Sequence, residues 1–463
     1  MTTIRAQIDS ETARIRAVLV NSGRCSFDEA DRIIDASCLT IELTEEAVGS
    51  AAGQAAFLTA VATGARCFGT VEVRGALEEP LRVRLPLEPQ RNTLGDCARM
   101  LGARSTTESD PERVLVIGTP RDDNRNARVQ AYWDGWIAGT APAGTPAPSG
   151  RGDCVLAGVA AGALGVGQAF LAAQGNVRAG RTRNELSLWS PDARAPREAI
   201  PGPDMASCHM PTAFWLIGLG NLGQAYLWSL AFLPYPEPER VLLFLQDDDH
   251  VRRENWGTSI LVRRGAYGDL KTRMAEDWAL RRGFHVRRID RQLDEHLRRM
   301  PGEPALALAG LDGMPARRLL GKPGFEFVVD GGLGATAADY SKFRLNVFDS
   351  NADPAAHFNG VDEDTSQGVE RLMELPAYQA LARATDELGC GKARTLAGKS
   401  VAVPFVSAVT GALAIAQTIR IACGKAGYAS LTGDIRDIAG VRATQESRID
   451  RLRIPTTLAA IGE

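Results

Sequence analysis

An apolar segment that runs directly into a glycine-rich turn constrains the fold of this chain more than any other feature. Residues 214–223 read Phe-Trp-Leu-Ile-Gly-Leu-Gly-Asn-Leu-Gly, a buried strand followed by a G-x-G-x-x-G turn. Gly218 permits the tight turn, Gly220 lets the backbone approach phosphate oxygens, and Gly223 lets the next helix close on the sheet. The first N–H groups of that helix then face an anion. The pattern predicts a nucleotide-binding unit, but NAD, FAD and ATP sites all share it.

Polar residues follow this turn at the ends of later predicted elements. Asp247 ends the next apolar strand, where a carboxylate accepts hydrogen bonds from ribose hydroxyls, and Asp249 follows it as a second ligand or a solvated loop charge. Lys271 suits a triphosphate that changes geometry during reaction. Asp312 follows the apolar strand 305–310, where a carboxylate can hold Mg²⁺ through oxygen. We therefore expect ATP and Mg²⁺ as cofactors, with Asp312 as the metal ligand.

These residues and one asparagine occur in the order Asp247, Asp249, Asn255, Lys271 and Asp312. This order resembles the ThiF/MoeB/ubiquitin-activating-enzyme superfamily. The resemblance implies that Asp247 binds the ribose, that Asn255 and Lys271 contact the phosphates, and that Asp312 positions magnesium. It is close over residues 214–334 and looser over 388–422.

Alternating strands and helices predict an α/β fold in which strand carboxyl ends share one ligand-binding edge. Strands are expected near 16–20, 69–74, 81–86, 113–118, 186–189, 213–218, 241–246, 305–310, 326–330 and 342–348. Helices are expected near 27–37, 45–64, 154–174, 221–233, 269–283, 371–388 and 404–422. With the resemblance, this pattern predicts a Rossmann-like, ThiF-type adenylation domain, with a parallel-rich sheet and helices on both of its faces.

A proline-rich stretch divides the chain. We read 196–212 as a linker between a domain at 1–195 and the adenylation domain at 213–463. Short segments of the first domain resemble segments of the second in the same order, namely 114–118, 133–141 and 162–169 against 305–310, 329–337 and 411–418. We predict that the first domain is a degenerate, inactive copy of the second. Chance similarity among Ala- and Gly-rich helices is the alternative.

Cys390 is the candidate nucleophile. It lies between two glycines with Lys392 and Arg394 just beyond, and nearby positive charge lowers a thiol pKa. A thioester on this cysteine would store the energy of an adenylate and release AMP. The segment at about 338–399 would then be a crossover that covers an incoming protein tail. A buried, inert cysteine is the alternative.

One position departs from the family pattern. The family places an arginine where this chain has Thr258, and a lost bidentate contact can be worth about 1.5–3 kcal/mol. Arg263 and Arg264, or Arg181 and Arg183 of the first domain, are candidate replacements. Without a replacement, the chain would bind nucleotide poorly and act as a non-catalytic scaffold.

Composition narrows the partners and the location. The 53 basic and 56 acidic residues are nearly balanced, so we expect no nucleic-acid surface. The N-terminus lacks an apolar signal segment, and the eight cysteines include no C-x-x-C pair, so we expect a cytoplasmic protein without a zinc ribbon. The uncharged stretches 154–175 and 400–419 are rich in Ala and Gly, which favours buried helices over membrane spans.

The resemblance implies an ATP-dependent activating enzyme for a ubiquitin-like protein. The C-terminal carboxylate of that partner would be adenylated, transferred to Cys390 and passed to a separate conjugating enzyme. The chain looks similar to bacterial activating enzymes of ubiquitin-like conjugation systems in antiphage defence, and a homo-oligomer is compatible with this expectation. The alternatives are sulfur-carrier or peptide adenylation without a thioester, and an NAD- or FAD-dependent oxidoreductase.

Overall fold

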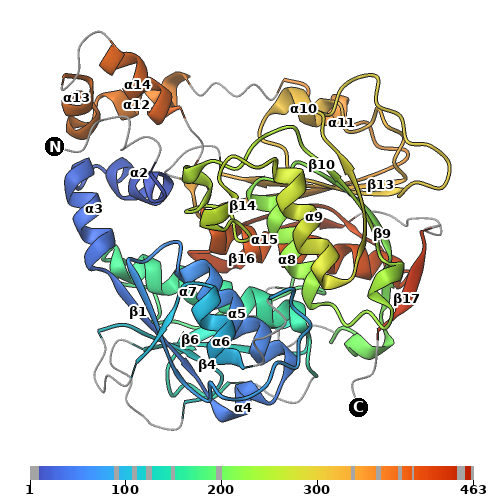
Figure 1. The fold of residues 1–463 in the computed structure, drawn as a ribbon, viewed down its shortest axis with the longest axis horizontal. Helices are drawn as coiled ribbons and strands as arrows, with labels where there is room; N and C mark the ends of the chain where they lie inside the picture. Colours follow the sequence, from blue (N-terminus) through green and yellow to red (C-terminus); the bar gives the residue numbers. More distant parts are fainter. Residues whose placement is uncertain are drawn as a thin grey trace.

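The computed structural model describes residues 10–87, 93–106, 112–120, 128–147, 152–193, 195, 201–334, 339–360, 366–383, 388–398, 401–445 and 454–459. These residues form two α/β halves, each built around its own mixed sheet (Figure 1). We call residues 10–193 the first half and residues 201–459 the second half. The predicted α/β class is confirmed.

The first half contains a seven-stranded sheet of order β3-β2-β1-β4-β5-β6-β7. Its strands are β1 (Cys38–Leu43), β2 (Thr70–Gly75), β3 (Arg104–Ser105), β4 (Val114–Ile117), β5 (Arg128–Asp134), β6 (Ile137–Pro142) and β7 (Asn184–Ser187). Neighbouring strands from β3 to β5 are parallel, and β6 and β7 join antiparallel. Its helices are α2 (Ala13–Asn21), α3 (Phe27–Ala36), α4 (Glu45–Val48), α5 (Ala51–Gly64), α6 (Leu94–Met100) and α7 (Val155–Ala173).

The second half contains an eight-stranded sheet of order β11-β10-β9-β12-β13-β14-β15-β16. Its strands are β9 (Ala213–Ile217), β10 (Leu242–Gln246), β11 (His285–Ile289), β12 (Leu306–Ala309), β13 (Phe327–Leu333), β14 (Lys342–Asp349), β15 (Tyr428–Asp434) and β16 (Asp437–Gln445). Its helices are α8 (Asn221–Phe232), α9 (Lys271–Arg282), α10 (Met314–Arg318), α11 (Pro354–His357), α12 (Ser366–Met373), α13 (Pro376–Arg383), α14 (Leu388–Ala397) and α15 (Pro404–Ala422). Short 3-10 turns are η1 (Met205–Ser207), η2 (Pro238–Arg240), η3 (Arg253–Asn255) and η4 (Arg264–Ala266). Strands β8 (His209–Pro211) and β17 (Thr456–Leu458) pair separately, so part of the expected linker is a strand.

The two halves repeat one chain order and one sheet order. Strands β1, β2, β4 and β5 take the places that β9, β10, β12 and β13 take in the second half. Helices α5 and α7 correspond in the same way to α8 and α15. The similar sequence segments 162–169 and 411–418 lie in α7 and α15, at equivalent places in the two halves. An internal duplication produces this kind of arrangement.

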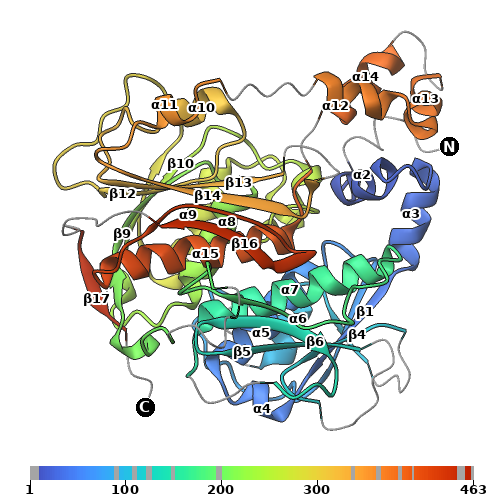
Figure 2. The same ribbon diagram turned by 180° about the vertical axis from the view of Figure 1, so that it is seen from behind.

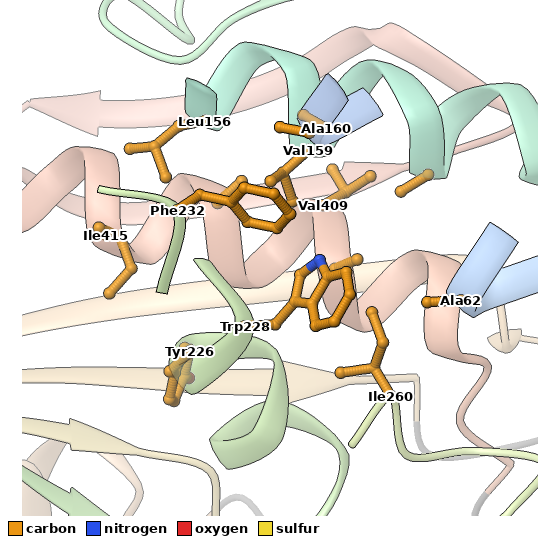
Figure 3. Close-up of a cluster of buried hydrophobic side chains, with 14 of the residues drawn as sticks. Ala62, Leu156, Val159, Ala160, Tyr226, Trp228, Phe232, Ile260, Val409 and Ile415 are labelled. Atoms are coloured by element: carbon orange, nitrogen blue, oxygen red, sulfur yellow. The ribbon is translucent and has the colours of Figure 1, made fainter. Parts of the chain in front are cut away.

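Helices α5, α7, α8 and α15 lie between the two sheets (Figures 1 and 2). Both α7 and α15 are long and apolar enough to cross a membrane, yet 94% of the apolar window of each is buried inside the protein. An apolar surface on all sides of a helix matches this central position. Figure 3 shows Trp228 and Phe232 of α8 in one cluster with Val159 of α7 and Val409 of α15. The Trp228 Nε1 donates to the Thr59 hydroxyl of α5 at 2.9 Å, so the cluster spans both halves.

Glycine allows α5 and α7 to approach at backbone distance. A Cβ at Gly158 would lie 2.0 Å from the carbonyl oxygen of Ala52, and one at Gly162 would lie 2.1 Å from that of Ala56. Real Cβ atoms cannot come so close, so larger side chains would force the helices apart. The Ala- and Gly-rich composition of α7 is therefore a packing requirement.

Two expected strands are wrong. Residues 16–20 lie in α2, and residues 81–86 lie outside any strand. The short apolar run in α2 fits a strand or a helix equally well, and only its packing decides between them. Strands β1, β5, β6, β11, β15 and β16 were not expected from the sequence.

Candidate active site

Strands β9, β10 and β12 end at the same edge of the second sheet. The register pairs Ile217 of β9 with Gln246 of β10 and with Ala309 of β12. The residues that follow the three strands, Gly218 and Asp247 among them, therefore meet at this edge. As predicted for parallel strands, the carboxyl ends gather the candidate residues.

The glycine-rich turn has the geometry that its sequence implies. Gly218 has φ +82°, a left-handed conformation that favours glycine. A Cβ at Gly223 would lie 2.1 Å from the Gly218 carbonyl oxygen, so the turn cannot close on a larger residue. Gly220 faces open space, and α8 begins after it without a side-chain cap among the described residues. The first N–H groups of α8 are thus available to an anion.

Asp247, Asp249 and Lys271 form one connected group beside the turn. Asp247 accepts a hydrogen bond from the Leu219 N–H at 2.6 Å and another from the Asp249 N–H at 2.8 Å. The Lys271 Nζ lies 2.8 Å from an Asp249 carboxylate oxygen. Lys271 itself is 9% exposed. The structure therefore brings the predicted ribose acid and the predicted lysine to the same side of the turn.

The two acids of this group ionise differently. Burial raises the pKa of Asp247, although the charge of Lys271 opposes the rise. Burial also acts against the ionisation of Asp249, but the hydrogen bond and the charge of Lys271 outweigh it and hold the pKa of Asp249 below its ordinary value. Asp249 is thus the counter-ion of Lys271 beside the glycine-rich turn.

A cleft of about 440 Å³ opens on the other side of the turn. Its lining comprises Asn221, Leu222, Gly310, Leu311, Asp312, Met314, Arg317, Gly332, Leu333, Gly334, Lys342, Phe343, Arg344, Gly398 and Ala402. Asp312 is exposed and lines this cleft, as does Asn221 at the start of α8. Arg317 donates to the Leu311 carbonyl at 2.9 Å and to the Gly331 carbonyl at 3.0 Å, which ties the Asp312 loop to β13.

The Asn255 loop is anchored to the start of α8, but the Asn255 amide oxygen accepts a hydrogen bond from the backbone of its own loop. Asn255 Oδ1 accepts from the Arg252 N–H at 2.8 Å. The Ser259 hydroxyl donates to Asn221 Oδ1 at 2.8 Å. Thr258, which replaces the family arginine, is 4% exposed, and its hydroxyl donates to the Asn255 carbonyl at 3.3 Å. The buried Thr258 side chain therefore stabilises the loop through a hydrogen bond to the loop's own backbone.

Arg66 of the first half holds this loop in place, and sequence analysis missed it. Its Nε donates to the Ser259 carbonyl and its Nη2 to the Val262 carbonyl, both at 3.0 Å. Its guanidinium carbon lies 4.7 Å from the centre of the Trp256 ring. Complete burial lowers the pKa of Arg66 to about 10. No local pattern marks this arginine, because its partners lie about two hundred positions away.

The first-half arginines proposed as replacements are not brought to the turn. Arg183 pairs with Glu185 at 3.2 Å and donates to the Pro146 carbonyl at 2.7 Å, both within the first half. Arg181 is exposed in the loop before β7.

The N-terminal helix supplies different contacts to the second half. Arg264 binds Glu11, just before α2, at 3.0 Å, so its charge is already engaged. Arg14 of α2 lies 3.5 Å from Glu254, next to Asn255. Arg263 is exposed on the loop that follows Thr258. No local pattern marks Arg14, because its partner Glu254 lies 240 positions away in the chain.

Cys390 lies in the first turn of α14, and its side chain is outside the described residues. Gly398, eight positions later, lines the cleft, and at 1.5 Å per residue the separation along this path is about 12 Å. Leu396 of α14 packs with Tyr378 of α13 against Val20 and Phe27 of the N-terminal helices. Helices α12–α14 therefore lie on α2 and α3 (Figure 1).

The sequence as a whole matches a described family in both halves. The profile of the BilD N-terminal domain matches residues 38–188, and that of the BilD C-terminal domain matches residues 210–425. The bacterial E1-like protein BilD of Collimonas sp. (strain OK412) is 32% identical over 428 residues, which cover 91% of this chain and 90% of that protein. This chain belongs to the BilD family of bacterial E1-like proteins.

The solved structures that are similar to this BilD-family chain have much lower sequence identity to it. A crystal structure of E. coli MccB with MccA-N7isoASN is 12% identical, covers 52% of this chain and 66% of that chain, and has a TM-score of 0.35. PaaA is 13% identical, covers 51% of this chain and 63% of that chain, and has a TM-score of 0.32. This chain thus spans just under two thirds of the length of these relatives.

Proposed function

We propose that this BilD-family chain uses ATP to adenylate the C-terminal carboxylate of a ubiquitin-like protein. The acyl group then moves to Cys390 as a thioester and from there to a separate conjugating enzyme. The observation that carries the proposal is the continuous edge formed by the open start of α8, the Asp247–Lys271–Asp249 group and the cleft at Asp312. A triphosphate with its metal would use both Lys271 and Asp312, whereas a dinucleotide would leave these two residues without a role.

The residues at Asp312 suit Mg²⁺ bound together with phosphates. Among the described residues, no three His, Cys, Asp or Glu side chains gather as a metal cage. A single exposed carboxylate such as Asp312 is nevertheless a common way to hold Mg²⁺, because this ion keeps waters and takes other ligands from substrate phosphates. When bound, Mg²⁺ would neutralise charge on the phosphates.

The proposed chemistry assigns each group one task. A carboxylate oxygen of the incoming tail attacks the α-phosphorus of ATP, and pyrophosphate leaves. Lys271, which Asp249 holds beside the glycine-rich turn, stabilises the negative charge that develops on the phosphates. The Cys390 thiolate then attacks the acyl carbon, and AMP leaves. Because about 12 Å of α14 separates Cys390 from the cleft, this second step requires α12–α14 to move relative to the cleft.

ATP–pyrophosphate exchange tests the first step. We expect the wild type to catalyse exchange with ubiquitin-like proteins that end in glycine, and Lys271→Met to reduce it about 100-fold or more. Arg273→Met, on an exposed position of the same helix, is the matched control and should retain exchange. Absence of both ATP binding and exchange in the wild type would refute the proposal.

A second assay separates the thioester from adenylation. The wild type should form a modifier conjugate that thiol reductants cleave, and Cys390→Ala should lose this conjugate while keeping exchange. Persistence of the conjugate in Cys390→Ala would move the thioester to another cysteine. If no conjugate forms although exchange proceeds, the chain adenylates without a thioester step.

A non-catalytic scaffold is the second candidate function. The buried Thr258 and the engagement of Arg264 by Glu11 favour it, because the loop then lacks a free arginine at either position. Calorimetry that detects partner binding without ATP binding would support the scaffold. The cytoplasmic location and the antiphage role stay predictions.

A further inference from the structure

Three cationic side chains line the cleft, those of Arg317, Lys342 and Arg344. Acidic groups among the described residues balance only part of this positive charge. Arg317 faces the buried Asp330 at 3.4 Å, and Lys342 faces Asp339 at 2.7 Å. Arg344 on β14 has no ion pair among the described residues, and its Nε is buried without a hydrogen-bond partner there. Within the part of the chain that the structure describes, one cation of the cleft therefore lacks an anion.

This arrangement is costly unless a ligand supplies the missing anion. Burial, reinforced by the charge of Arg317, lowers the pKa of Arg344. Among the described residues, the carboxylate that opposes this shift is Asp330, whose Oδ2 accepts from Arg317 and from the Asn346 amide at 3.3 Å and which forms no ion pair with Arg344 there. A half-buried charge without a counter-ion or full hydrogen bonding is unfavourable.

The surroundings of Arg344 suit a carboxylate. Its guanidinium carbon lies 5.8 Å from the centre of the Phe358 ring, so an aromatic face covers one side of the planar group. A guanidinium stacked in this way keeps its N–H groups in the plane for an acceptor, and carboxylates match their spacing in a bidentate manner.

The sheet geometry fixes the distance between Arg344 and the reaction centre. Arg344 pairs with Gly332 of β13, and β13 lies beside β12, whose end leads to Asp312. Strands are about 4.8 Å apart, so β14 lies about 10 Å from β12. An extended chain advances about 3.4 Å per residue, so a peptide whose last carboxylate is at Asp312 would place an earlier residue, about three positions back, near Arg344.

We propose that Arg344 determines substrate specificity by binding an acidic side chain about three residues before the carboxylate that is adenylated. This inference rests on the proposed function, and it names the class of tail that the cleft accepts. Gly332, Gly334 and Gly398 line the same cleft and contribute only backbone atoms to its wall.

Binding of labelled hexapeptides tests the proposal. Each peptide ends in Gly-Gly with a free carboxylate and carries Glu or Gln three residues before its last residue. We expect the full-length wild type to bind the Glu peptide about 10- to 100-fold more tightly, the effect of one charge-assisted bidentate contact. Arg344→Gln should lose the preference, and Arg442→Gln, on exposed β16 of the same sheet, should keep it.

Further arms keep the test decisive. Arg344→Glu should reverse the preference toward a peptide with Lys at the same position, which a misfolded variant could not do. Equal affinity for the Glu and Gln peptides, no binding of either, or a preference that survives in Arg344→Gln would each overturn the inference. Affinity for a fluorescent ATP analogue should not change in Arg344→Gln; a loss there would assign Arg344 to phosphate instead. If the wild type binds no ATP analogue, the proposed function fails, whatever the peptides show.

Discussion

The two halves build the same sheet but close its ligand edge differently. Where β9 runs into Gly218, the equivalent β1 runs into Thr44, whose hydroxyl donates to the Ile117 carbonyl at 2.9 Å. A Cβ at Gly118 would lie 2.3 Å from this hydroxyl, so Thr44 fills the space at the strand ends. Helix α5 then starts with its Ala51 and Ala52 N–H groups donating to the Asp153 carboxylate, each at 2.8 Å.

The sheet register also shows which residues stand at the places of the candidate site. Asp247 follows the β10 residue paired with the end of β9, and Ala76 holds this place after β2. By the same register Pro120 corresponds to Asp312, and Leu94 opens α6 where Lys271 opens α9. The fold is therefore shared, while the described residues of the first half at these equivalent places include neither an open helix start nor the charged groups. Function belongs to the site and not to the fold.

The largest expected effect separates Asp312 from its counterpart in the first half. Asp312→Asn removes the proposed Mg²⁺ ligand, and we expect ATP–pyrophosphate exchange to fall about 100-fold or more. Pro120→Ala should leave exchange unchanged. Equal losses in the two variants would show that both halves bind nucleotide and would break the comparison.

Arg66 tests whether the first half serves the second as a support. Arg66→Met removes the buried donors to the Ser259 and Val262 carbonyls, so we expect the free energy of unfolding to drop by about 2–4 kcal/mol. ATP affinity should fall with it, because the same loop is anchored to α8 through Ser259. Denaturant unfolding and titration with an ATP analogue measure the two effects. Arg66→Lys should recover part of both; if it recovers stability alone, the loop position does not control nucleotide binding.

Asp153 tests whether the first half is blocked by its own side chain. Asp153→Ala removes the acceptor of the Ala51 and Ala52 N–H groups at the start of α5, and we expect a loss of about 1–2 kcal/mol in the free energy of unfolding. ATP affinity and exchange should not change, because the second half is untouched. Phosphate or ATP binding newly gained by Asp153→Ala, seen by calorimetry, would mean that this carboxylate blocks an anion site in the first half.

The smallest effect concerns pH. The pKa of Asp249 in the folded protein lies below its unfolded value, so its pairing with Lys271 stabilises the fold above about pH 4 and loses this contribution as pH falls through the folded pKa. The difference in Tm between the wild type and Lys271→Met should therefore be largest near about pH 6 and shrink towards about pH 3. A difference that is constant across this range would contradict the assignment. Leu94 cannot form such a pair at the equivalent place in the first half.

Local sequence patterns predicted the parts of the second half that are local in nature. Gly218, Gly220 and Gly223 act within ten residues of one another, so their spacing alone specified the turn. Asp247 and Lys271 could be placed because parallel strands end at a common edge. The strands of the first half were harder to predict, and α2 was misread, because a short apolar run does not distinguish a strand from a helix.

The sequence by itself determined the strand–turn–helix unit and the order of the acids and the lysine that follow it. Tertiary structure alone decided that Arg66 supports the Asn255 loop, that Asp153 binds the start of α5, and that Arg344 lines the cleft without a counter-ion among the described residues. Each of these depends on groups that are distant in the chain, and packing of the two halves brings them together. A turn depends on neighbouring residues and can be read from them, whereas a buried charge depends on everything that surrounds it.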